Sequence, residues 1–238
     1  MRLTILGCGR FNITANYNST GNLIETERVN ILVDFGRGCL YSLTKLGKQV
    51  GDIDAICISH LHPDHIADLL TFFQIFFNTC ADKPLIIVGP VGIQQWFKTM
   101  VDLVLEPVPT KITIYEQPLT AIEIGDVTVT TAVMKHNVPA TAFRFEQAGH
   151  SVVYSGDTGM NENIVSLARQ TDVLLLECSN QPGQISAQHL NPEQCSDIAT
   201  QAKVKQLVLT HYGYDLTKTN MPFNGTLVIA KELMTIDL

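Results

Sequence analysis

The stretch of sequence that decides the fold is Ser59-His60-Leu61-His62-Pro63-Asp64-His65. It follows residues 53–58, a mostly apolar run that is typical of a buried β-strand. If the chain stays extended, His60, His62 and Asp64 lie on one side of it, and His65 turns in beside them where Pro63 ends regular pairing. Imidazole nitrogens and carboxylate oxygens are ligands for zinc, manganese and iron, and burying four such groups without an ion costs free energy. The stretch therefore predicts a metal site at the end of a strand.

Further donors follow other strand-like runs. His136, Asp157 and His211 each come just after an apolar stretch of the sequence. Loops at the carboxyl ends of strands are where α/β domains gather their ligands. Together with the first stretch, these residues supply enough donors for two metal ions and a carboxylate to bridge them. His150 instead lies in a polar turn, where we expect it to be solvated.

The rest of the chain alternates strands and helices. We expect strands at residues 3–6, 20–25, 28–34, 55–59, 85–89, 112–115, 127–133, 142–146, 151–155, 173–177 and 206–210. We expect helices at residues 38–46, 66–79, 91–103, 161–170, 191–202 and from 223 onward. The continuous apolar runs indicate strands covered on both faces, and hence a layered α/β or α+β domain. We interpret the irregular, proline-containing stretch 103–118 as a connection inside that domain.

Composition and charge restrict the class of protein. The chain has 238 residues, 45% of them hydrophobic and 16% charged, which favours one globular domain spanning residues 1–238. No signal peptide or membrane span is expected, and the six cysteines show no paired spacing, so we expect reduced thiols, a cytoplasmic location and no membrane partner. The net charge of −7 argues mildly against a dedicated polynucleotide binder.

Taken together, these motifs resemble the metallo-β-lactamase superfamily, in particular its ribonuclease Z-like and phosphodiesterase-like branch. The landmarks are residues 6–9, 32–36, 59–65, 136, 154–158, 176–177, 189–190 and 209–211. The resemblance implies an α+β fold, the αββα sandwich, in which two mixed sheets pack face to face with helices outside. It also implies two divalent metal ions at one edge of the sheets. His60, His62 and His136 would hold one ion, Asp64, His65 and His211 would hold the other, and Asp157 would bridge them. Zinc is our first choice, with manganese or iron also compatible.

Several residues separate the branches of this superfamily. His62 stands where the oxygen-reducing di-iron relatives carry Glu, and Asp157 stands where a β-lactamase carries Cys. His189 precedes a helix that Asn191 and Pro192 are suited to start, as N-cap and first helical residue. In the ribonuclease Z-like branch the matching histidine acts on the phosphate, although His189 could also be a loop residue that bonds the helix start.

The resemblance implies catalysis by Asp64 and His189. A metal-bound hydroxide, oriented by Asp64, would attack phosphorus, while His189 would donate to a phosphoryl oxygen or protonate the leaving oxygen. Metal-bound histidines need acceptors for their other ring N–H, and Asp34, Asp54 and Glu177 are candidates, with Glu177 an alternative partner for His189.

The substrate is less well defined by the sequence. Only about twenty residues separate His136 from Asp157, whereas ribonuclease Z enzymes of the bacterial short form insert a long arm for transfer RNA there. We therefore favour a small phosphodiester or a short nucleic acid as the substrate partner. The alternatives are lactone or thioester hydrolysis by the same metal pair, transfer-RNA 3′ processing, and a non-catalytic accessory member of the fold.

Residues 66–79 carry an aromatic stripe. Phe72, Phe73, Phe76 and Phe77 are three and four residues apart on the expected helix. The stripe is consistent with a helix that packs on the sheet. Alternatively, the apolar side chains around this helix contact a partner subunit, which would make the protein a homodimer. They could instead line the substrate pocket.

Overall fold

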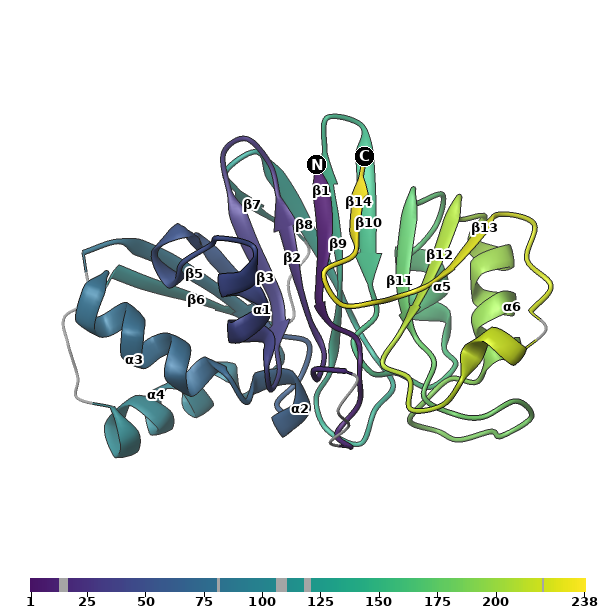
Figure 1. Ribbon diagram of the computed structural model, residues 1–238, viewed down its shortest axis with the longest axis horizontal. Helices are drawn as coiled ribbons and strands as arrows, with labels where there is room; N and C mark the ends of the chain where they lie inside the picture. Colours follow the sequence, from purple (N-terminus) through teal and green to yellow (C-terminus); the bar gives the residue numbers. More distant parts are fainter. Residues whose placement is uncertain (13–16, 81, 106–110, 118–120, 220) are drawn as a thin grey trace.

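Two sheets of seven strands pack face to face in the computed structural model, which describes residues 1–12, 17–80, 82–105, 111–117, 121–219 and 221–238 (Figure 1). Helices cover the outer face of each sheet, and the two termini lie side by side at one end of the molecule. This is the predicted αββα sandwich. Among the described residues, no helix has the length and apolar character needed to cross a membrane.

The first sheet has the order β14-β1-β2-β3-β4-β5-β6. Strands from β14 to β3 pair antiparallel and strands from β3 to β6 pair parallel, so the sheet is mixed. Its strands are β1 (Arg2–Gly7), β2 (Gly21–Glu25), β3 (Asn30–Phe35), β4 (Ala55–Cys57), β5 (Pro84–Gly89), β6 (Lys111–Glu116) and β14 (Thr235–Asp237).

The second sheet repeats this plan in the order β13-β12-β11-β10-β9-β8-β7. Strands β7 to β10 pair antiparallel and strands β10 to β13 pair parallel. Its strands are β7 (Ala121–Ile124), β8 (Val127–Val133), β9 (Thr141–Gln147), β10 (His150–Tyr154), β11 (Val173–Glu177), β12 (Gln206–Thr210) and β13 (Thr226–Ile229).

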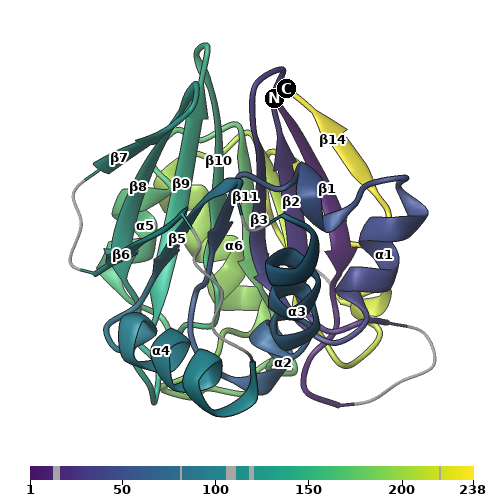
Figure 2. The ribbon, with the colours of Figure 1, turned by 90° about the vertical axis from the view of Figure 1, so that its left-hand side faces the viewer.

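The helices flank the two sheets on their outer faces. Helices α1, α3 and α4 lie against the first sheet and α5 and α6 against the second, while α2 lies at the lower edge of the sandwich (Figures 1 and 2). Their bounds are α1 (Cys39–Lys45), α2 (Pro63–Ile66), α3 (Leu69–Thr79), α4 (Ile93–Val104), α5 (Glu162–Leu167) and α6 (Pro192–Ala202), with short 3₁₀ turns η1 (Val50–Asp52) and η2 (Leu216–Lys218).

Alternation along the strands divides the apolar side chains between two cores. In β3, Ile31 and Val33 belong to the core between the sheets, whereas Leu32 faces α3 and its neighbours. Phe143 and Phe145 fill the space between the sheets from the other side. Because both faces of the central strands are buried, their carboxyl-terminal loops are held at fixed positions along one edge.

The predicted aromatic stripe belongs to the second of these cores. Phe72, Phe73 and Phe76 are 0% exposed and Phe77 is 5% exposed, packed between α3 and the first sheet. Phe72, Phe73 and Phe76 therefore cannot wall the substrate pocket, because rings without exposed surface cannot contact a substrate. Leu70 and Ile75 of the same helix are exposed, so contact of its remaining apolar side chains with a partner subunit or a substrate stays a prediction.

Two helix predictions need correction. The helix predicted from residue 223 onward is wrong: this tail forms β13, parallel to β12, and β14, antiparallel to β1. Its run Thr226–Ile229 is mostly β-branched, and the edges of both sheets offer unpaired backbone groups.

The helix predicted at 66–79 is divided into α2 and α3. The break occurs near Asp68, whose amide donates to the carbonyl of Phe35 and whose carboxylate accepts the amide of Leu40.

Other differences concern strand limits. Strand β4 ends at Cys57 rather than at residue 59, and β7 has no counterpart among the predicted strands. In the stretch 103–118, residues 106–110 and 118 lie outside the described residues, and the remainder contains the end of α4 and strand β6.

Candidate metal centre

The loop after β4 delivers the first donors. His60 and His62 lie in an extended connection, and α2 begins directly afterwards at Pro63, whose fixed φ suits the first helical position. Asp64 and His65 are therefore helical residues. The prediction that Asp64 continues an extended alternation is wrong, although it reaches the same edge of the sheets.

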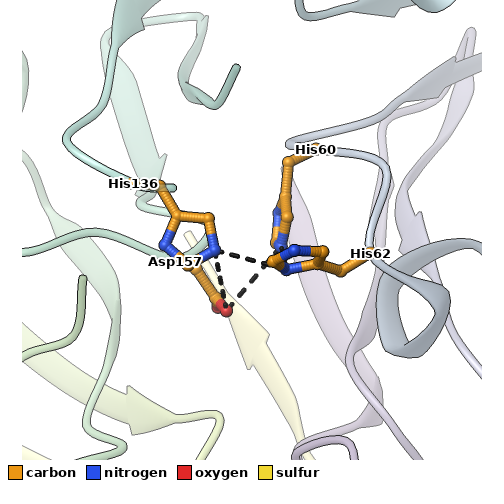
Figure 3. A group of neighbouring side chains, drawn as sticks. All are labelled: His60, His62, His136 and Asp157. Atoms are coloured by element: carbon orange, nitrogen blue, oxygen red, sulfur yellow. Dashed lines mark hydrogen bonds and ion pairs between the residues drawn. The ribbon is translucent and has the colours of Figure 1, made fainter. Parts of the chain in front are cut away.

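The first donor group comprises His60, His62, His136 and Asp157. Figure 3 shows the three rings and the carboxylate directed toward one another. His62 Nδ1 lies 3.0 Å from His60 Nε2 and 3.3 Å from His136 Nε2. Asp157 Oδ2 lies 3.7 Å from His60 Nε2 and 4.0 Å from His136 Nε2. One ligand atom from each residue thus faces a common space.

The second donor group comprises Asp64, His65 and His211. His211 Nε2 lies 3.3 Å from His65 Nε2 and 3.2 Å from Asp64 Oδ2. Asp157 lies between the two groups, because its Oδ1 is 3.4 Å from His65 Nε2 while its Oδ2 faces the first group. The structure therefore brings together all seven residues that the sequence predicts as ligands, and their ligation of an ion stays a prediction.

In the first group, the hydrogen bonds made by Nδ1 of His60 and His136 show which ring nitrogen carries the proton. Ser59 Oγ donates to Asp34 at 2.7 Å, so at 3.0 Å from His60 Nδ1 it acts as acceptor of that N–H. His136 Nδ1 donates to the carbonyl oxygen of Gln188 at 3.1 Å. Both rings consequently present an Nε2 lone pair to the shared space.

The same logic holds in the second group. His65 Nδ1 donates to Asp34 Oδ2 at 2.7 Å. Ser179 Oγ donates to the carbonyl of His211 at 2.9 Å, so it accepts the Nδ1–H of the same ring at 2.7 Å. In the neutral rings the two Nε2 lone pairs face each other at 3.3 Å, so a proton or a cation must lie between them. A cation between them relieves this contact, and it is the arrangement expected of metal ligands.

The negative charge of the buried carboxylates also favours a cation in the site. Asp157 Oδ1 is buried and accepts no hydrogen bond from any described residue, although His211 Nδ1 and His65 Nε2 lie 3.3 and 3.4 Å away. Although burial favours the neutral acid, His211 and His65 hold the pKa of Asp157 well below its usual range. Burial likewise disfavours a charged His65, but Asp157 and Asp34 outweigh it and raise the pKa of His65. Burial, followed by the charge of His65, lowers the pKa of His60, which keeps that ring neutral. The residues present therefore fit a divalent ion.

One ligand of the second group, His211, and the residue that supports its His65, Asp34, have a strained backbone. Asp34 has φ of 54° and His211 has φ of 53°, in the left-handed region that side chains other than glycine rarely adopt. Such conformations cost roughly 1–3 kcal/mol each and persist where the surroundings hold them. Here Asp34 accepts hydrogen bonds from His65, Ser59 and Tyr154, which hold its carboxylate in one position.

His189 lies at the open side of the donor groups. Its Nδ1 donates to Glu177 Oε1 at 2.9 Å, and its ring centroid is 5.4 Å from that of His136. Glu177 is buried and is itself held by the amides of Thr158 and Ser179. Burial opposes protonation of His189, but the hydrogen bond that the ring donates to Glu177 outweighs it and raises the pKa of this ring. The geometry leaves Nε2 of His189 available to a ligand.

The predicted acceptors divide into two that serve the site and one that does not. Asp34 binds His65, and Glu177 binds His189 rather than a predicted metal ligand. Asp54 is wrong for this role, because it accepts the amide of Asn30 and pairs with Lys83. His150 is exposed at the start of β10, as expected for a solvated residue.

Three supporting partners escape the sequence interpretation. They are the hydroxyls of Ser59 and Ser179 and the carbonyl of Gln188. Only Ser59 carries a signal, since it stands directly before His60 in the decisive stretch. The position of the other two depends on how distant loops meet.

Comparison with known proteins identifies the family. Residues 29–212 match the family model described as the β-lactamase superfamily domain. The chain is 31% identical over 247 residues to the probable metallo-hydrolase YhfI of Bacillus subtilis, covering 97% of each sequence. It is 25% identical to a ribonuclease Z of Clostridium tetani, covering 88% of each. The chain therefore belongs to the metallo-β-lactamase superfamily.

Solved structures agree on the fold. The crystal structure of B. subtilis YhfI superposes with a TM-score of 0.85 at 27% identity, covering 99% of both chains. The human tRNase Z short form superposes with a TM-score of 0.84 at 20% identity, covering 100% of this chain and 99% of that one. The fold, the family and the His/Asp clusters together support a metallo-hydrolase that binds a divalent metal.

Proposed function

We propose that this protein is a dinuclear metal-dependent phosphodiesterase that acts on a small phosphodiester or a short nucleic acid. The observation that carries the proposal is the placement of Asp157, with one oxygen toward each donor group. Two adjacent groups joined by a carboxylate are the arrangement that two-metal hydrolases require. Zinc suits this set of imidazole and carboxylate donors, with manganese or iron as alternatives.

The seven donors hold the ions in this proposal. When bound, a pair of divalent ions acidifies water and offsets negative charge on a phosphoryl group. Asp64 has a second task, because its carboxylate accepts a hydrogen bond from the attacking water and orients it. His189, kept in one tautomer by Glu177, donates from Nε2 to a phosphoryl oxygen or to the leaving oxygen.

The preference for a small substrate rests on the short segment between His136, after β8, and Asp157, after β10. Between His136 and Asp157 the chain forms only the β9–β10 hairpin, closed by Ala148 and Gly149. This hairpin offers no extended surface to grip a large RNA, and remote contacts are what a large substrate contributes to the chemical step. The net charge of −7 adds no attraction for a polyanion.

A substrate panel tests the proposal. After chelation and return of zinc, manganese or iron, hydrolysis of bis(4-nitrophenyl) phosphate is compared with that of a lactone and a thioester. We expect the diester to have the highest kcat/KM, and lower kcat/KM for precursor transfer RNA under the same metal and salt conditions. Faster lactone or thioester hydrolysis indicates a carboxyl-ester enzyme, efficient cleavage at the transfer-RNA 3′ end indicates a processing enzyme, and no turnover with metal bound indicates an accessory protein.

A further inference from the structure

A second cation lies beside the donor groups. Arg10 follows β1, and its Nη1 donates to the carbonyl oxygen of Ser179 at 3.0 Å. Ser179 is the residue whose hydroxyl accepts the Nδ1–H of His211. Arg10 is thus joined to the second donor group through one intervening residue, Ser179.

The charge of Arg10 is not compensated by a carboxylate in the described part of the chain. It makes no ion pair there, and its buried Nε has no hydrogen-bond acceptor. The side chain is half-buried, so its cation is partly removed from water. A partly desolvated guanidinium with free donors is unfavourable in the absence of an anion, which makes a bound anion the natural partner.

The guanidinium is also held in place. Its Cζ lies 5.2 Å from the ring centroid of Phe11, which is 65% exposed. The backbone at Gly213 lies close to Arg10 Cδ, since a Cβ added at Gly213 would meet this carbon at 3.1 Å. Stacking on Phe11, contact with the loop after His211 and the bond to Ser179 therefore orient Arg10 beside the second donor group.

We propose that Arg10 binds a second phosphate of the substrate, next to the phosphodiester that the donor groups and His189 engage. The inference rests on the proposed function and narrows its substrate class to diesters with a further phosphate, such as a nucleotide phosphorylated at its other end. Arginine is suited to this task because its planar fork matches two oxygens of a phosphate.

Binding of two nucleotides to the metal-loaded full-length protein tests the inference. Calorimetric titration compares thymidine 3′,5′-bisphosphate with thymidine 5′-monophosphate, which lacks the second phosphate. We expect the bisphosphate to bind at least about tenfold more tightly, the scale of a hydrogen bond to a charged group. Arg10→Ala should remove this difference while leaving affinity for the monophosphate and the metal content unchanged, and Arg10→Lys should keep part of it.

A matched control separates this role from a general effect of charge. Arg37 is also half-buried, and its buried Nη2 has no hydrogen-bond partner among the described residues, but its charge acts to lower the pKa of Asp68, away from the donor groups. Arg37→Ala should preserve the preference for the bisphosphate. Equal affinity of the unaltered protein for both nucleotides, or an unchanged preference in Arg10→Ala, overturns the inference.

Cleavage of bis(4-nitrophenyl) phosphate distinguishes the two proposals. This diester has one phosphate, so its cleavage by the unaltered protein depends on the donor groups and His189 and does not require a second phosphate at Arg10. If the protein cleaves it but binds neither nucleotide, the inference is wrong and the phosphodiesterase remains. If the protein shows neither cleavage nor binding, the proposed function is wrong, and the inference fails with it.

Discussion

The two donor groups share Asp157 but are supported differently. In the first group, the outer nitrogens of His60 and His136 are bound by a hydroxyl and a backbone carbonyl, and His62 is half-buried. In the second group, the buried His65 is bound by the buried carboxylate of Asp34. A charged, buried acceptor increases the basicity of a ligand more than a neutral acceptor does, so we expect the second group to bind its ion more tightly.

Backbone conformation strengthens this contrast. The left-handed residues near the site, Asp34 and His211, both belong to the second group or its support. Strain of this kind is maintained by surrounding hydrogen bonds and marks a preorganised position. The comparison indicates that the second group acts as a fixed anchor and the first, beside His189, as the more open side.

The largest expected effect comes from the residue common to both groups. Asp157→Ala removes the carboxylate that lies between them, so both ions should be lost or bound much more weakly. Since each ion contributes several kcal/mol to the transition state, we expect turnover of the model diester to fall by at least about 10⁴-fold. Metal analysis after gel filtration, with the exposed Asp237→Ala as control, measures the first effect. Two ions retained at full occupancy would contradict a bridging role.

Loss of His189 should leave both groups intact and still impair chemistry. His189→Ala should reduce turnover by roughly two to four orders of magnitude, the range for a general acid, without loss of metal. His150→Ala, at the exposed start of β10, is the matched histidine control. Lost metal would identify His189 as a ligand, and unchanged turnover would identify it as a loop residue that only bonds the helix start.

Substitution of Asp34, which accepts the hydrogen bond of His65, tests how much this carboxylate contributes to metal binding in the second group. Asp34→Asn keeps the size of the side chain but removes the charge that faces His65 Nδ1. We expect about 10–100-fold weaker binding of the ion of the second group. The loss at the first group should be smaller, because Asp34 reaches His60 only through the hydroxyl of Ser59. Stepwise chelation followed by metal analysis resolves the two ions. A loss divided equally between both would contradict the difference between the groups.

The sequence is enough to predict the donors and the charged acceptors Asp34 and Glu177, but not the neutral groups that support the donors. His60, His136 and Asp157 are recognisable because their residue types are metal ligands and each follows a strand. Gln188 contributes a backbone carbonyl, which has no residue-type signature, and Ser179 reaches His211 only because β11 and β12 are neighbours in the sheet. Such contacts depend on tertiary structure, as does the pairing of the C-terminal residues at the sheet edges as strands.

The smallest expected effect concerns Ser179, the uncharged hydrogen-bond acceptor of His211 in the second group. Ser179→Ala removes the acceptor of His211 Nδ1–H, and a neutral hydrogen bond contributes about 1 kcal/mol, so affinity for the second ion should fall roughly fivefold. The change should be smaller than that of Asp34→Asn, because no buried charge is lost. Competition with a chelator of known affinity measures both variants on one scale. An effect of Ser179→Ala equal to or larger than that of Asp34→Asn would show that orientation of His211, and not the carboxylate behind His65, distinguishes the two groups.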